Sequence, residues 1–277
     1  MGYPKEIKPS IKKVAHNVVT LASPFSMVNV ANIGARMAIF KYGNELIFWS
    51  PIPYGPYIED AIDLLTRRRD NLSVTHLFVV NREHNVVAKS YLERYPDIKI
   101  VGGEGALGKD CPVHYEFKAE DGNKVIKGEE ARAKFHASGE FWSNLEFVYM
   151  SKHVNKELVI YEKNLHMLFE GDLLMDIGRP DNEGNYESYS PSTGYAHQFN
   201  PFTGVSWMIG QIKAGGWFGW IAHFVFSRTW SAEGAATVKL IYEAWDFDTI
   251  VQCHGNLITG IAKDTYAEIY PWLKKQQ

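Results

Sequence analysis

Five residues of this chain have the side chains and the positions of metal ligands. Glu83 and His84 are adjacent, and His153, Asp172 and His254 follow at wide spacing. The last three lie beside short apolar runs typical of strands, where a ligand can be held at the end of a sheet. Imidazole and carboxylate groups together suit Zn(II), Fe or Mn, and such sites often leave one coordination position open for water.

The order of these residues resembles that of the metallo-β-lactamase superfamily. In that family a strand leads to the pattern H-x-H-x-D-H, and a helix follows. Counting back from Pro96, at the end of the predicted helix, aligns His84 with the last histidine and Glu83 with the aspartate. Val79 and Asn81 then stand where the family has its first two histidines, so the resemblance implies that half of this motif is lost.

The later motifs of the family are better kept. The family carries a histidine about 19 residues before a Gly-Asp pair, and His153 and Asp172 have this interval (172 − 153 = 19) with a predicted strand pair between them. The last motif is a histidine after a C-terminal strand, which His254 matches. The resemblance covers roughly residues 15–260.

The resemblance also implies how many metal ions the site holds. One of the family's two metal positions would keep only His153 and Asp172, because Val79 cannot bind a metal and Asn81 is a poor neutral ligand. The other position keeps two imidazoles and two carboxylates: Glu83, His84, Asp172 and His254. We therefore expect one divalent metal, with zinc preferred over iron or manganese, and expect Glu83 and Asp172 to be catalytic. The alternative is a metal-free site, whose polar residues only hydrogen bond to one another within the core.

Apolar periodicity and turn residues predict how the chain folds. We expect strands at 18–22, 36–41, 45–49, 76–80, 98–103, 114–117, 124–126, 158–162, 165–170 and 250–253, and helices at 55–70, 231–245 and 262–273. Residues 1–14 are predicted to be a polar segment before the first strand, which we call the lead-in. Residues 107–142 show only weak apolar periodicity. The pattern alone supports α/β or α+β. The resemblance implies α+β, a single 1–277 domain built as a four-layer αββα sandwich, with two mixed β-sheets flanked by helices.

A long loop and an aromatic stretch follow Asp172. Residues 171–204 are rich in Gly, Pro, Asn and Ser, and loops of this length in compact domains are usually functional or disordered. Residues 205–226 include Trp207, Trp217 and Trp220. We expect the segment 173–230 to cover the site and to wall an apolar pocket. Two interpretations of the tryptophans stay open: packing in the core or at a subunit contact, or contact with an apolar or aromatic substrate.

Composition argues against some classes of binding partner and indicates a cellular compartment. A net charge of −3 without a basic stripe argues against a general nucleic-acid or anionic-membrane binder. Two cysteines, Cys111 and Cys253, make no disulfide framework, and strand alternation places Cys253 in the core, facing away from His254. No signal segment or long apolar run is evident, so we expect a cytoplasmic protein without a transmembrane segment. A homo-oligomer is left open.

For function, the resemblance implies a metal-dependent hydrolase of an ester, lactone, thioester or related acyl bond in a small-molecule substrate. A metal-activated water would be the nucleophile. Two alternatives belong to other classes. One is a non-catalytic binding protein that retains the fold, and the other is a non-hydrolytic metal enzyme such as a lyase or an iron oxygenase.

Overall fold

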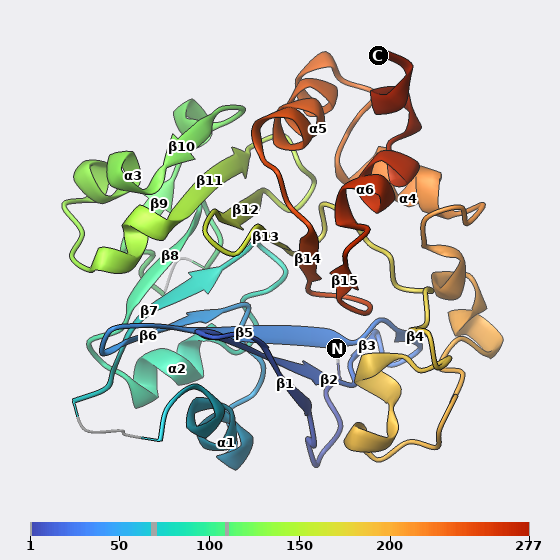
Figure 1. Cartoon of the computed structure of the whole chain (residues 1–277), viewed down its shortest axis with the longest axis horizontal. Coiled ribbons are helices and arrows are strands. Elements are labelled where there is room, and N and C mark those ends of the chain that lie inside the picture. Colours follow the sequence, from blue (N-terminus) through green and yellow to red (C-terminus); the bar gives the residue numbers. More distant parts are fainter. Residues whose placement is uncertain (1, 68–70, 109–110, 277) are drawn as a thin grey trace.

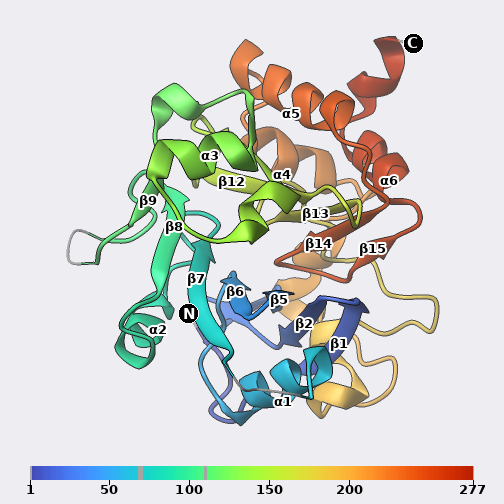
Figure 2. The same ribbon diagram turned by 60° about the vertical axis from the view of Figure 1, so that its left-hand side comes forward.

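Two β-sheets lie face to face and helices cover both outer faces of the pair (Figures 1 and 2). The computed structural model describes residues 2–67, 71–108 and 111–276. Both sheets mix parallel and antiparallel neighbours. The predicted α+β class and four-layer αββα sandwich are therefore confirmed.

The first sheet comes from the N-terminal part of the chain. Its strands, in spatial order, are β1 (Ser10–Ala15), β2 (Val18–Ser23), β5 (Ala35–Tyr42), β6 (Glu45–Trp49), β7 (Ser73–Val79), β8 (Lys99–Gly103) and β9 (Tyr115–Phe117). The strands from β6 to β9 are parallel, so the chain must cross over between them. Helices α1 (Pro56–Leu65) and α2 (Ala88–Arg94) make two of these crossovers and cover the outer face. A separate hairpin consists of β3 (Ser26–Met27) and β4 (Ala31–Asn32).

The second sheet contains the C-terminal strands. Its spatial order is β10 (Val125–Lys127), β11 (Leu145–Met150), β12 (Glu157–Glu162), β13 (Met167–Glu170), β14 (Thr249–Gln252) and β15 (Ile258–Thr259). Only β13 and β14 are parallel neighbours in this sheet, and the long segment between them carries two helices. The helices of this half are α3 (Gly128–Phe135), α4 (Gly219–Phe226), α5 (Ala232–Ala244) and α6 (Ala262–Ile269).

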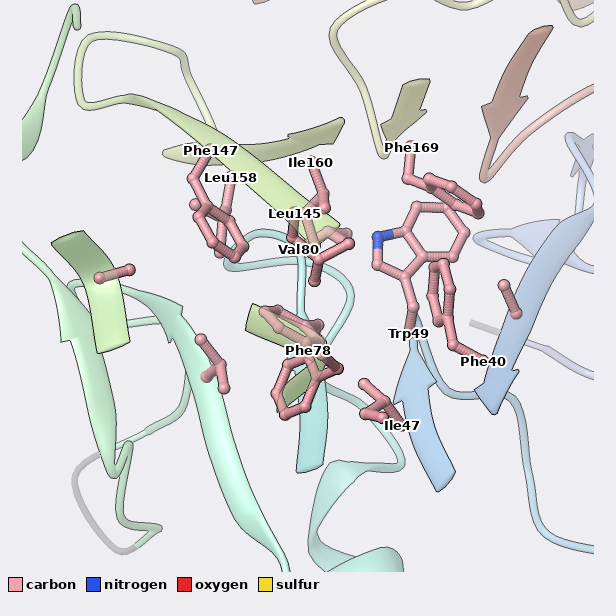
Figure 3. Packing of buried hydrophobic residues seen from close by; sticks show 14 of the residues in the cluster. Phe40, Ile47, Trp49, Phe78, Val80, Leu145, Phe147, Leu158, Ile160 and Phe169 are labelled. Atoms are coloured by element: carbon pink, nitrogen blue, oxygen red, sulfur yellow. The ribbon is translucent and has the colours of Figure 1, made fainter. Parts of the chain in front are cut away.

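Aromatic and aliphatic side chains fill the space between the sheets (Figure 3). Side chains alternate along a strand, so in β6 Ile47 and Trp49 face the second sheet while Phe48 faces the helices. Phe169 of β13 packs against Trp49 with ring centroids 5.5 Å apart, and against Phe40 at 4.7 Å. These contacts hold the two sheets together close to the end where β6 and β13 finish.

Most predicted strands are present, and the differences have physical causes. Strand β1 lies mostly within the predicted lead-in 1–14, because an edge strand can carry exposed lysines, here Lys12 and Lys13, and its sequence is then polar. Strand β11 was not predicted, and helix α3 lies within the weakly patterned stretch. The C-terminal helix ends at Ile269, since Pro271 lacks the amide hydrogen that a helix interior needs.

The other two predicted helices begin close to where the sequence placed them. Ser231 caps α5 by accepting a hydrogen bond from the Gly234 amide at 3.0 Å. Helix α1 ends at Leu65, and residues 68–70 of its predicted span lie outside the described residues. In the part of the chain that the structure describes, none of the helices is both long and apolar enough to cross a membrane.

The contact between the sheets can be tested by removing one ring. Phe169→Ala should lower the free energy of unfolding by about 3–5 kcal/mol, because it opens a cavity beside Trp49 and Phe40. Leu64→Ala, on the exposed side of α1, is the control and should cost less than about 0.5 kcal/mol. Urea unfolding measures both values, and equal losses would contradict this packing.

Candidate metal centre

Strand register brings Asp172 and His254 together. Strands β13 and β14 run parallel with Glu170 opposite Gln252, and each of the two candidate ligands lies two residues beyond that pair. Both therefore leave the second sheet at the same edge. His84 reaches this point from the first sheet, in the loop between β7 and α2. The site lies at one end of the sandwich, where loops from both sheets meet.

Three of the predicted ligands form a compact cluster. One ligand atom from each of His84, Asp172 and His254 lies within 4.8 Å of the others. The Nε2 atoms of His84 and His254 are 3.6 Å and 3.5 Å from Asp172 Oδ1. The two imidazole nitrogens thus converge on one carboxylate oxygen, as the ligands of a single cation do.

The remaining ring nitrogens have partners that orient the imidazoles. His254 Nδ1 is 2.7 Å from the carbonyl oxygen of Gly34, which can only accept, so Nδ1 carries the proton. Burial, together with the neighbouring His84, lowers the pKa of His254 to about 4. His254 is therefore neutral near pH 7 and presents an unprotonated Nε2 to the cluster, which is the form that binds a metal.

Ser50 supports His84 from a backbone conformation that serines rarely adopt. Its φ is +49°, in the left-handed region, and its hydroxyl lies 3.3 Å from His84 Nδ1. Strained residues of this kind are often found at functional sites. The Cys253 thiol donates to the Ser50 hydroxyl at 3.0 Å. Cys253 is buried as predicted, and it lies behind His84 rather than in the cluster.

The second oxygen of Asp172 is held by two amides. Asn81 Nδ2 donates to Oδ2 at 2.9 Å and Asn155 Nδ2 donates to it at 2.7 Å. Two donors use both lone pairs of Oδ2, so only Oδ1 remains for a cation. In this arrangement Asp172 offers a cation one oxygen, Oδ1.

Asn81 connects the strand end of the first sheet to the cluster. Besides Asp172, its amide group donates to Glu157 Oε2 at 2.7 Å, and its oxygen accepts from the backbone amides of Glu83 and His84. The tight fit requires glycine at 171, where a Cβ atom would come within 2.9 Å of Asn81 Nδ2. One amide side chain therefore fixes both the loop that carries His84 and the Asp172 carboxylate.

The structure places the other two predicted ligands outside the cluster. His153 is buried, its Nε2 lies 3.3 Å from the backbone oxygen of Asp172, and its Nδ1 accepts a hydrogen bond from the backbone N–H of Asn155. Glu83 is exposed and lines the adjoining cavity. These contacts suit a residue that positions Asp172 and Asn155. Ligand roles for His153 and Glu83 stay predictions.

A cavity of about 360 Å³ opens onto the cluster. His84, Asp172 and His254 line its polar end, together with Glu83 and Asn155. Its other walls are mainly apolar, and those beyond residue 172 include Met175, Ile177, Ile209, Ile212 and Phe226. Both the long loop and the aromatic stretch therefore contribute residues to an apolar wall beside Asp172.

Comparisons with known proteins identify the fold. No family model matches the chain, and no curated protein matches it. Among solved structures, the DIM-1 metallo-β-lactamase exposed to ceftazidime matches with a TM-score of 0.56 and 12% identity, over 100% of both chains. The FIM-1 enzyme of Pseudomonas aeruginosa in its mono-zinc form matches with a TM-score of 0.54 and 12% identity, over 99% of this chain and 98% of that one. The chain has the metallo-β-lactamase fold.

A third solved structure shares the metallo-β-lactamase fold over most of this chain. The metal-soaked Flv1 flavodiiron core from Synechocystis sp. PCC6803 has a TM-score of 0.58 and 17% identity. The match covers 98% of this chain and 62% of that one. At such low identities these likenesses establish the fold alone.

Several residues that shape the site were not predicted from the sequence. Asn155 and Glu157 precede and begin β12, and Ser50 follows β6. A signal existed for Glu157, which is an acidic residue at the start of the apolar run LVIY. Tyr3 also lines the cavity, although it lies in the predicted lead-in.

The three tryptophans of the aromatic stretch neither pack in the core nor line the cavity, and their predicted subunit contact stays a prediction. Trp207, Trp217 and Trp220 are 50%, 57% and 61% exposed, so they are not core residues. They do not line the cavity either. The error has a simple cause: aromatic content predicts burial because large rings gain from leaving water, and these three rings do not follow that tendency.

The charge of the cluster is concentrated on His84 and Asp172. Burial alone would lower the pKa of His84, but the facing Cys253 and Asp172 groups raise it well above its ordinary value. Burial alone would raise the pKa of Asp172, but the imidazoles of His84 and His254 hold it far below its ordinary value. Without a metal, we therefore expect an imidazolium at His84 beside a carboxylate at Asp172.

This charge distribution predicts a proton release. A metal ion can bind His84 only after the proton has left, so zinc binding near neutral pH should release about one proton. Because the pKa of His84 is raised, zinc affinity should fall about tenfold per unit as pH decreases below that pKa, and should level off above it. Calorimetric titration in buffers of different ionisation enthalpy counts the protons, and a count of zero at pH 7 would contradict the assignment.

Proposed function

We propose that the protein is a metal-dependent hydrolase that uses one divalent cation, zinc in preference to iron or manganese, to cleave an acyl bond. His84, Asp172 and His254 would hold the cation. The observation that carries the proposal is the convergence of His84 Nε2, His254 Nε2 and Asp172 Oδ1 at the polar end of an apolar cavity. Two nitrogens and one carboxylate oxygen are the protein ligands of many catalytic zinc sites.

The surroundings of the three ligands fit a bound cation. His254 has its second nitrogen on a carbonyl, and His84 has its second nitrogen beside a hydroxyl. Such partners orient ligating imidazoles in metal proteins. The amides on Asp172 Oδ2 favour one metal ion over two. The mono-zinc form of the FIM-1 enzyme offers a parallel at the level of the fold.

A divalent cation supplies Lewis acidity, which polarises a carbonyl group and lowers the pKa of water toward 7. The protein's own residues must then orient the substrate and accept a proton. Glu83 lines the cavity and lies outside the three-residue cluster, so its carboxylate is available to accept that proton. The apolar wall favours an apolar acyl group and excludes water, which strengthens electrostatic interactions at the polar end.

A second candidate follows from the same donor set. Two histidines and one carboxylate also form the ligand triad of iron enzymes that use oxygen. The Flv1 flavodiiron core has the same fold, which keeps this alternative open. The metal that copurifies with the protein separates the candidates: zinc supports hydrolysis, iron supports oxidation, and no metal supports a binding protein.

Metal content gives the first test of the proposal. Protein produced without added metal should contain about one zinc per chain, because one such cluster is found among the residues that the structure describes, with Asp172 Oδ1 facing both imidazoles. His254→Ala should lose most of this zinc, whereas the exposed His16→Ala control should keep it. Elemental analysis measures the ratio. Two tightly bound metals per chain would show that the first metal position is still functional.

The role of Glu83 can be separated from that of the ligands. If Glu83 accepts a proton, Glu83→Gln should leave zinc affinity nearly unchanged and lower kcat for an acyl ester about 100-fold or more. If Glu83 is a fourth ligand, the same variant should weaken zinc binding by about tenfold or more. Zinc titration and ester hydrolysis by the zinc-loaded protein distinguish the two roles. Unchanged values in both assays would remove Glu83 from the site.

A further inference from the structure

Exposed apolar side chains gather on one part of the surface near the cavity. They belong to residues 27–30, 205–208 and 217–230, and we call this set the apolar rim. Its largest members include Trp207, Trp217, Trp220 and Trp230, each at least half exposed. The other four of the chain's eight tryptophans are buried or half-buried. Patches of this kind on soluble proteins mark binding surfaces for proteins or membranes.

The parts of the apolar rim are joined to one another. Ser206 donates to the backbone oxygen of Val30 at 2.7 Å, which fixes the residues 205–208 beside the β3–β4 hairpin. The rings of Trp207 and Trp217 are 6.2 Å apart. Phe224 and Trp230 are 5.1 Å apart. In Figure 1 this region occupies one side of the molecule, from β3 and β4 to α4.

The apolar rim continues into the cavity wall. Met27 is 43% exposed and also lines the cavity. Ile209 and Phe226 line the cavity as well, and each directly follows an exposed rim residue, Met208 or Val225. The entrance to the proposed active site is therefore bordered by apolar residues that extend onto the surface.

The apolar rim carries few charges. Residues 24–35 contain no acidic or basic residue, and residues 199–230 contain Lys213 and the exposed Arg228, no acidic residue, and one buried histidine, His223. Two cations are fewer than the basic clusters that bind anionic headgroups, so the apolar side chains must supply most of the binding. A surface without net charge is therefore sufficient as the partner. Tryptophan, with an apolar ring and a polar N–H, suits the boundary between lipid headgroups and acyl chains.

We propose that the apolar rim docks onto an uncharged lipid surface and that the substrate enters the cavity from that surface. A second copy of the chain bound to the rim would cover the entrance, because rim and cavity wall share residues such as Met27. A lipid surface leaves the entrance in contact with its substrate. The substrate is then an amphiphile with an apolar acyl chain. Only this statement about the substrate rests on the proposed hydrolase function.

Vesicle binding tests the docking surface without any assay of hydrolysis. The full chain should cosediment with phosphatidylcholine vesicles, and neither anionic lipid nor low salt should be needed, because apolar side chains rather than the two basic residues supply most of the binding. The double variant Trp217→Ala, Trp220→Ala should reduce partitioning on the order of tenfold or more, since two large rings no longer leave water. Leu64→Ala, an exposed apolar change on α1 away from the rim, is the control and should not alter it.

Each result bears on the proposal separately from the metal site. His254→Ala protein should bind vesicles like the unaltered protein, even if the hydrolase proposal fails. Unchanged melting temperature and zinc affinity in the double tryptophan variant would exclude misfolding as a cause of lost binding. The proposal is overturned by absent cosedimentation, by binding that requires anionic lipid, or by equal binding of the double variant. It is also overturned if sedimentation velocity shows a dimer that the double variant dissociates, because the rim then belongs to a second copy.

Discussion

The burial of the Asp172 carboxylate is the constraint on which the site depends. Removing such an ion from water costs several kcal/mol unless other groups compensate it. Here two imidazoles face Oδ1 and two side-chain amides donate to Oδ2. These four groups come from three loops, after β7, β11 and β14. A single buried charge therefore draws loops from both sheets to one point, and the candidate metal ligands meet there.

The cavity places apolar walls beside this polar cluster. Apolar residues such as Ile177, Ile209 and Ile212 line the space beside the cluster. Electrostatic interactions are stronger in apolar surroundings than in bulk water, so a cation there would act on a substrate with little screening. The exposed tryptophans near the cavity extend the same apolar character outward. Under the proposed function, one continuous wall would serve both substrate access and metal chemistry.

The candidate cluster could be predicted from the sequence because its members follow strands in a recognisable order. His84, Asp172 and His254 each stand just beyond an apolar run, and alternation also predicted the buried side of β14. Asn155 could not be predicted, because its role depends on the tight turn that aims its amide at Asp172. The exposure of the tryptophans could not be predicted either, because composition gives the number of aromatic rings but not which of them are buried.

The parallel register of β13 and β14 has a consequence for how the chain can change in length. Side chains alternate along a strand, so deleting one residue within β14 would move His254 into the place of Cys253, on the opposite face, and leave Gly255 in the place of the imidazole. The core could survive such a slip while the site would not. Insertions in the segment between the two strands leave this pairing intact. The long connection between β13 and β14 can therefore vary in length during evolution without loss of the site. Strand β14 cannot.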